Sequence, residues 1–220
     1  MPRIARSYQK ALCYHVMNRG VNGQAIFADD RDREYFIGLI REYKLLCGAR
    51  VYHWVLMGNH YHLLIEVRHE RLRNFVGGMQ QAYAQYHHRR HEGSGVFWQG
   101  RYKSKAVEVG LYVAICGRYI ERNPARAGLS TVAWEWRWSS ARAYVGGIED
   151  GVTDRNPYLG EMTTKDRVLY GEALASGVDE KVVLDLERKR AFGSDEFVSR
   201  LTIDHGRHCP KRGRRWTVMS

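Results

Sequence analysis

The sequence predicts an α+β fold in which helices flank an antiparallel, ferredoxin-like sheet, followed by a basic, partly helical C-terminal extension. Three observations lead to this prediction. Strand-like and helix-like patterns alternate over the first 123 residues. The chain has 220 residues, 44% of them hydrophobic, with only 4 prolines, which is typical of one sizeable domain with an appendage or of two small domains. From about residue 150 the composition changes, and basic residues gather towards the C-terminus.

Each element of the main domain has its own signal in the sequence. Strand segments alternate in polarity or are apolar on both faces, as central strands are, and they stop at glycine or asparagine turns. Helical segments repeat apolar residues at three- and four-residue spacing. The predicted order is a strand at 12–19, a helix from Asp29 to Gly48, strands at 50–57 and 60–67, a helix at 70–90, a strand at 103–109 and a helix at 111–123 that stops at Pro124.

The segment after Gly128 is less regular. Trp134, Trp136 and Trp138 alternate, so they would share one face if the backbone is extended, and we expect core packing rather than base stacking. Residues 141–145 precede a break at Gly146-Gly147, and helices are predicted at 179–189 and 194–201. Residues 188–215 hold nine basic and three acidic residues, more than half of the net charge.

The charge favours a polyanionic partner. The net charge is +11 and the pI is near 9.6, which raises the local concentration of nucleic acid, although many other basic proteins share this property. The 4 cysteines are too far apart for a zinc ribbon or a disulfide scaffold. No run of about 18 apolar residues and no signal peptide is present, so we expect a cytoplasmic protein without a membrane partner.

Two histidines could bind a metal. His60 and His62 are two apart on a predicted strand, so their side chains point to the same face and could share one divalent ion through neutral nitrogens. The alternative is a polar strand face, and two histidines in any case need a third ligand. His53, an odd number of positions away, is expected to be structural. His87, His88 and His91 are expected to contact phosphate or solvent rather than metal.

A tyrosine and an amide could complete such a site. Tyr119 and Asn123 are four apart, so they are neighbours on one face of a helix, with Pro124 ending that helix. The amide oxygen could ligate a hard metal while the phenol attacks. Taken alone, the pair is better explained by a core aromatic and a helix-terminating residue.

Together these motifs resemble the REP-associated tyrosine transposases of the HUH endonuclease superfamily. The resemblance covers about residues 8–145, and the family's pattern differs here at Gly58, usually proline, and Ala125, usually valine. The resemblance implies a catalytic domain at 1–147 with the HUH fold and an extension at 148–220. It is carried by four blocks in the family's order: Tyr14-His15-Val16-Met17-Asn18-Arg19-Gly20, 54–64, Gly100-Arg101-Tyr102-Lys103-Ser104 and 119–129.

The resemblance also implies a mechanism. His60, His62 and Asn123 would hold Mg²⁺ or Mn²⁺, and Tyr119 would attack single-stranded DNA to give a 5′-phosphotyrosine and a free 3′-hydroxyl. The substrates would be hairpins of repetitive extragenic palindromes, the protein would be nucleoid-associated, and a monomer is favoured over a dimer. The alternatives are a catalytically silent hairpin-binding regulator and a hydrolase that uses water.

DNA contacts are expected from basic and aromatic side chains in three places. Arg3 and Arg6 lie in an N-terminal arm that could reach guanine edges or stay solvated. Arg101, Tyr102 and Lys103 lie in a loop before a strand, where a plain exposed turn is the alternative. The tail would clamp the hairpin stem or fold back over the active site, and its proposed contacts are Lys211, Arg212, Arg214 and Arg215.

Overall fold

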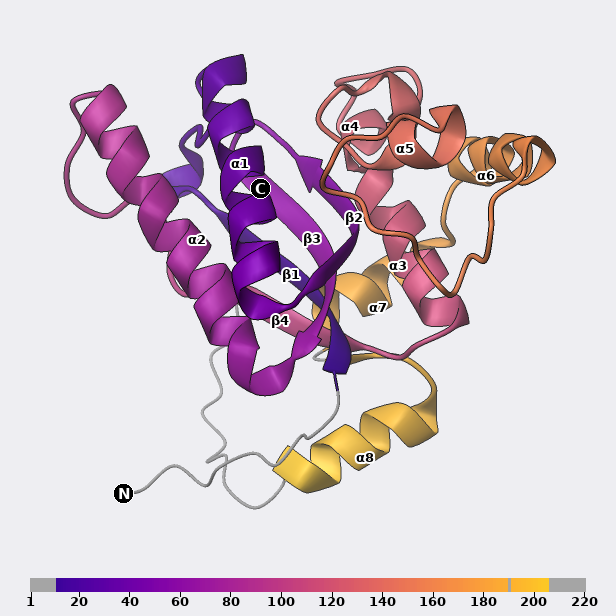
Figure 1. Ribbon diagram of the computed structural model, residues 1–220. Helices are drawn as coiled ribbons and strands as arrows, with labels where there is room; N and C mark the ends of the chain where they lie inside the picture. Colours follow the sequence, from indigo (N-terminus) through magenta and orange to yellow (C-terminus); the bar gives the residue numbers. More distant parts are fainter. Residues whose placement is uncertain (1–10, 190, 206–220) are drawn as a thin grey trace.

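The computed structural model describes residues 11–189 and 191–205. In this part of the chain the strands form one mixed five-stranded sheet in the order β2-β3-β1-β4-β5 (Figure 1). Strands β1 to β4 pair with one another antiparallel, and β5 pairs parallel with β4. The strands are β1 (Ala11–Arg19), β2 (Arg50–Leu56), β3 (His60–Arg68), β4 (Lys103–Val107) and β5 (Ala191–Phe192).

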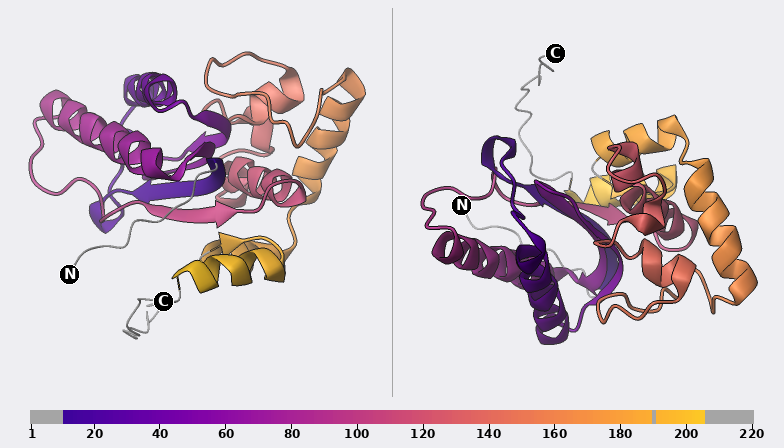
Figure 2. Two further views of the ribbon diagram at one scale, coloured as in Figure 1. Left: turned by 60° about the horizontal axis from the view of Figure 1, so that its bottom comes forward. Right: turned by 90° about the horizontal axis from the view of Figure 1, so that it is seen from above.

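Two long helices, α1 (Asp30–Cys47) and α2 (His69–Arg90), cover one face of the sheet (Figure 2). Helix α1 begins where the Asp29 side chain accepts a hydrogen bond from the Asp32 amide, and it ends at Gly48, which has φ +58°. Apolar side chains from alternate positions of β1 and β3, and from Val51, Trp54 and Leu56 of β2, meet α1 and α2 in the largest hydrophobic cluster. This cluster provides the main burial of apolar surface.

Helices α3 (Leu111–Glu121) and α7 (Glu180–Arg188) cover the opposite face (Figure 2). Their apolar side chains meet the alternate positions of the strands, for example Cys13 and Leu64. The close approach of α3 to β2 depends on Gly117, because a Cβ there would lie 2.5 Å from the His53 ring. The sheet is therefore buried on both faces, as the apolar strand pattern predicts.

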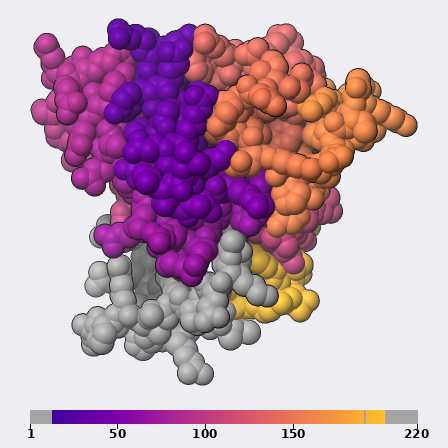
Figure 3. Space-filling view, viewed as in Figure 1, coloured from indigo at the N-terminus to yellow at the C-terminus, as the bar shows by residue number. Residues whose placement is uncertain are grey.

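The remaining elements follow α3. They are α4 (Asn123–Arg126), α5 (Ala141–Gly146), α6 (Thr164–Ser176), α8 (Asp195–His205) and the 3₁₀ turns Val21–Gly23 and Ala133–Glu135. Helices α5 and α6 enclose a third, smaller hydrophobic cluster. The segment between them lies against α1 (Figure 3), where Lys44 contacts Asp154 at 2.9 Å and donates to the Val152 carbonyl.

The α+β prediction, with helices flanking the sheet, is confirmed, and three details of its elements differ. The sheet is mixed rather than wholly antiparallel, because the unpredicted β5 adds parallel to β4. Helix α6 was also not predicted. Pro124 does not end a helix with Asn123 in its last turn: α3 ends at Glu121, and Asn123 begins α4 with the proline in its first turn.

The three tryptophans do not share one face. The backbone around Trp134 forms a 3₁₀ turn, so the period of two is lost. Trp134 packs with α5 and α6, Trp136 donates its Nε1 hydrogen to the Leu56 carbonyl at 3.0 Å, and Trp138 is buried against the main cluster. The expectation of core packing is nevertheless correct.

Candidate active site on the α3 face of the sheet

The alternation of β3 directs His60 and His62 to the same face, the one covered by α3. The intervening Tyr61 is buried in the main cluster on the other face. The rings of His60 and His62 lie 5.2 Å apart at 85°, and Tyr119 of α3 meets His62 at 6.1 Å and 89°. His62 and Tyr119 are buried, whereas His60 is half-buried. The structure thus brings three of the predicted site residues together.

Asn123 stands one helical turn beyond Tyr119. Its Nδ2 donates to the carbonyls of Tyr119 at 2.9 Å and Ile120 at 3.1 Å. These bonds tie the first residue of α4 to the end of α3 and engage the amide nitrogen. The oxygen Oδ1 is then the atom suited to a hard cation.

Both histidines have Nδ1 engaged. His60 Nδ1 lies 2.7 Å from Asn59 Oδ1, and His62 Nδ1 lies 2.9 Å from His15 Nε2. Burial lowers the pKa of His60, with a smaller contribution from Arg19, and burial lowers the pKa of His62 further. Both imidazoles are therefore neutral near pH 7, the form that binds a metal, and Nε2 is the nitrogen that remains for it.

Burial and charged side chains on two neighbouring helices set the electrostatic surroundings of Tyr119. Burial raises the pKa of the Tyr119 phenol, and Glu187 of α7 raises it further, while Arg126 of α4 lowers it. The Arg126 guanidinium lies 5.3 Å from the centre of the Tyr119 ring and 3.4 Å from the Glu187 carboxylate. Arg126 was not singled out from the sequence, because the helix that carries Tyr119 is expected to stop at Pro124, which leaves no spacing rule to place the two side chains together.

Six of the proposed DNA-contact residues lie outside the described part of the chain: Arg3, Arg6, Lys211, Arg212, Arg214 and Arg215. Arg101 and Lys103 are exposed. Lys103 pairs with Met17 of β1, which pairs in turn with His62, so Lys103 is on the same sheet face and in the same register as the histidine. Tyr102 instead packs, half-buried, against the main cluster on the other face.

A fully buried hydrogen-bond network supports the end of α3. The Glu121 carboxyl group accepts from His53 Nδ1 at 2.8 Å, from the Ser140 hydroxyl at 2.5 Å and from the Tyr170 hydroxyl at 2.7 Å. His53 Nε2 in turn contacts Asn156 Nδ2 at 3.0 Å. The structural role predicted for His53 is confirmed, but its partner Glu121, two residues from Tyr119, was not recognised in the sequence.

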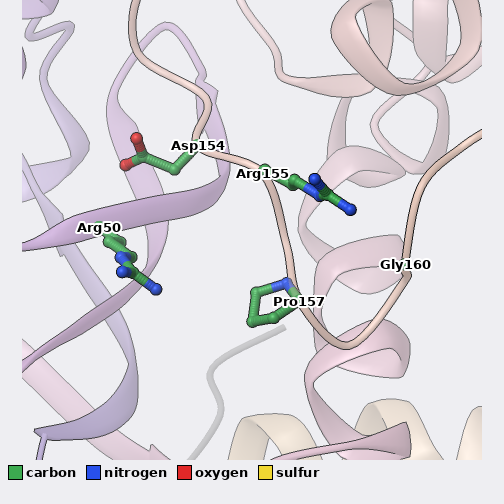
Figure 4. A pocket seen from close by; sticks show the side chains of 5 residues that line it. All are labelled: Arg50, Asp154, Arg155, Pro157 and Gly160. Carbon is green, nitrogen blue, oxygen red and sulfur yellow. The ribbon is translucent and has the colours of Figure 1, made fainter.

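Two other features lie away from this site. Asp32, His87 and His91 offer ligand atoms within 4.8 Å of one another at the ends of α1 and α2, but Asp32 already accepts from Arg90, His91 and the Ala28 amide. A surface hollow of about 440 Å³ (Figure 4) contains none of the predicted site residues; its lining consists of Arg50, Asp154, Arg155, Pro157 and Gly160.

The chain belongs to the family described as "Transposase IS200 like", whose sequence profile matches residues 8–123. Family membership indicates a transposase that cleaves and rejoins DNA and implies a divalent metal ion. None of the curated protein sequences matches this chain. In the described residues, no helix is long and apolar enough to cross a membrane.

Two solved structures are reported for comparison. The chain is similar to a structure described as the REP-associated tyrosine transposase bound to a REP hairpin. The match has a TM-score of 0.56 and 16% identity, and covers 70% of this chain and 92% of the other. A second match, a putative transposase from Deinococcus radiodurans, has a TM-score of 0.39 and 19% identity, and covers 56% of this chain and 97% of the other. The first match confirms the fold.

Proposed function

We propose that this protein is a divalent-metal-dependent single-strand DNA endonuclease and strand transferase, with Tyr119 as the nucleophile. The observation that carries the proposal is the contact of the Tyr119 ring with His62, on the sheet face where His60 and His62 both keep Nε2 available. A tyrosine beside a metal-binding histidine pair joins a nucleophile to a site that can polarise phosphate.

The donor set fits a divalent ion. We assign His60 Nε2, His62 Nε2 and Asn123 Oδ1 as ligands, since neutral imidazoles and an amide oxygen suit Mn²⁺ and, less strongly, Mg²⁺. When bound, the ion supplies charge that stabilises the non-bridging oxygens of the scissile phosphate. The protein keeps the ligands neutral by burying them and holds Asn123 through the two carbonyls of α3.

The phenolic oxygen of Tyr119 attacks phosphorus, the bond from phosphorus to the 3′ oxygen breaks, and the 5′ phosphate stays on the tyrosine. Because one phosphodiester replaces another, a second 3′-hydroxyl can reverse the step and join two strands. The phenol loses its proton on attack, since its pKa is raised, and the guanidinium of Arg126 favours the developing phenolate.

We infer that the substrate is a hairpin of repetitive extragenic palindrome type, bound by a monomer at the nucleoid in the cytoplasm. The similar solved transposase was bound to a REP hairpin. On this chain, Lys103 and Arg101 are exposed beside the site and would contact backbone phosphates. Tyr102, the arm residues Arg3 and Arg6 and the tail, within an extension at 148–220, are further proposed contacts.

The test is a labelled hairpin incubated with protein and Mn²⁺ or Mg²⁺, followed by denaturing electrophoresis. Wild type is expected to form a covalent protein–DNA adduct, and Tyr119→Phe is expected to bind the hairpin without cleaving it. The matched control is Tyr112→Phe, which removes a hydroxyl from the same helix. Cleavage without an adduct that survives in Tyr119→Phe would indicate hydrolysis by water. Tight binding without cleavage in either metal would indicate a regulator.

A further inference from the structure

His15 is a buried histidine at the centre of the sheet that the proposed mechanism does not use. It lies on β1, opposite Leu64 of β3 and Lys105 of β4, with its side chain fully enclosed. Its ring stacks on His62 at 5.1 Å and 26°, and meets the Tyr119 ring edge-on at 5.9 Å and 74°. His15 therefore touches both a proposed metal ligand and the proposed nucleophile.

The hydrogen bond between His15 and His62 decides which nitrogen of His62 can bind metal. His15 Nε2 and His62 Nδ1 are 2.9 Å apart, so one nitrogen carries the hydrogen and the other accepts it. If His62 Nδ1 donates, His62 Nε2 carries no hydrogen, and its lone pair is free to coordinate the metal. If His15 donates instead, the single hydrogen of neutral His62 sits on Nε2, and that nitrogen cannot ligate.

The surroundings keep His15 able to accept. The His15 side chain has no exposed surface, and Lys105, its neighbour on β4, is also buried, so a positively charged imidazole is disfavoured and one ring nitrogen keeps a lone pair. Within the described chain, His15 Nδ1 has no hydrogen-bond partner, so the contact with His62 is the one hydrogen bond that can decide which His15 nitrogen carries the hydrogen. The hydrogen bond with His62 is therefore the one hydrogen bond that the His15 side chain makes within the described residues.

We propose that His15 is a positioning residue that accepts the Nδ1 hydrogen of His62, thereby fixing the tautomer and ring plane in which His62 Nε2 ligates the metal. The inference rests on the proposed function, because it assigns a role toward the metal site. In other proteins, removing such a partner from a ligating histidine weakens metal binding about 10- to 100-fold. We expect a loss of that size here.

Two substitutions separate the hydrogen bond from packing. His15→Phe keeps an aromatic ring against His62 and Tyr119 but removes the acceptor. His15→Gln can place its amide oxygen near the former Nε2 position and restore the acceptor without the ring. Mn²⁺ affinity, measured by calorimetry without DNA, reports ligation directly, and thermal unfolding without metal reports whether each variant is folded.

We expect His15→Phe to bind Mn²⁺ about 10- to 100-fold more weakly than wild type and His15→Gln to recover most of the affinity. Wild-type affinity in folded His15→Phe, with binding abolished in His62→Ala, would overturn the inference and leave the metal site intact. Absence of Mn²⁺ binding in wild type itself would overturn the proposed metal site, and the inference with it.

A measurement on the unaltered protein gives an independent test that does not depend on the variants folding. Nitrogen-15 chemical shifts of His62 in the Mg²⁺-loaded protein distinguish hydrogen on Nδ1 from hydrogen on Nε2. The inference expects Nδ1–H on His62 and a hydrogen-bonded, hydrogen-free Nε2 on His15. Hydrogen on Nε2 of His62 in the loaded protein would overturn it.

Discussion

Replacing Glu121 with alanine removes the acceptor of three buried donors at once. His53, Ser140 and Tyr170 each donate to this carboxyl group, and the Glu121 and His53 side chains have no exposed surface. The donors come from β2, from the residue before α5 and from α6, so the carboxyl group joins three elements to the end of α3. The loss should therefore reduce global stability rather than only local order.

The magnitude follows from the donors left behind. A buried donor without a partner costs about 1–3 kcal/mol. The three costs are not additive, because water or a rearranged neighbour can satisfy part of the network, so we expect Glu121→Ala to lower the free energy of unfolding by about 3–5 kcal/mol. With a urea m-value of about 2–3 kcal/mol/M, the midpoint of unfolding should fall by about 1–2 M.

The assay is urea unfolding followed by far-ultraviolet circular dichroism, with Glu187→Ala as the matched control. Glu187 is also a glutamate near Tyr119, but its ion pair with Arg126 is 3.4 Å long and about half exposed. Its loss should cost about 0–1 kcal/mol. If Glu121→Ala lowers the midpoint no more than Glu187→Ala does, the reasoning about this network is wrong.

Three further predictions concern pH, DNA and metal. Burial alone would raise the pKa of Asp32, yet hydrogen bonds from the Ala28 amide, His91 and Arg90 lower this pKa below its ordinary value of 3.8. The ionised Asp32 carboxylate therefore stabilises the folded protein above pH 3.8, and this stabilisation is lost as the pH falls through the lower pKa of the folded state. Urea midpoints should therefore drop more between pH 6 and pH 3 in wild type than in Asp32→Asn; equal drops would contradict this. Lys103→Ala should weaken hairpin binding and reduce the slope of log K against log salt by about 1 in a salt titration, and an unchanged slope would exclude a phosphate contact. Chelation of divalent ions should abolish the covalent adduct while hairpin binding persists in a mobility-shift assay, and adduct formation in the chelator would rule out metal dependence.

The sequence was sufficient where a short-range pattern determines the outcome. Period-two and period-3.6 patterns located the first four strands and the helices α1, α2 and α3, and the two-residue spacing correctly placed His60 and His62 on one face. Helix α6 lacks such a pattern: it exposes Val168 and Leu169 while burying Tyr170 and Leu174, so no single apolar stripe marks it. Strand β5 has two residues, too few for any alternation.

Contacts between residues that are far apart in the sequence could not be predicted. His15 and His62 are 47 residues apart, and His53 and Glu121 are 68 apart. Each is an ordinary polar residue until the register of the sheet and the docking of α3 bring the pair together. The break between α3 and α4 was missed for a different reason: a proline can begin a helical turn as readily as it can follow the end of one, and Pro124 does the former.

The register of β1 against β3 links stability and chemistry in a way that constrains both strands. Tyr14 and Val16 face the main cluster, while Cys13 and His15 face α3; on β3, Tyr61 and Leu63 face the cluster, while His62 faces α3. A shift of one residue in either strand would bury the imidazoles among α1 and α2 and turn the apolar residues to the site. The apolar side chains of the opposite face therefore enforce the histidine geometry, and substitutions in that cluster that loosen the register should reduce Mn²⁺ affinity even though those side chains lie on the other face of the sheet from the proposed metal ligands.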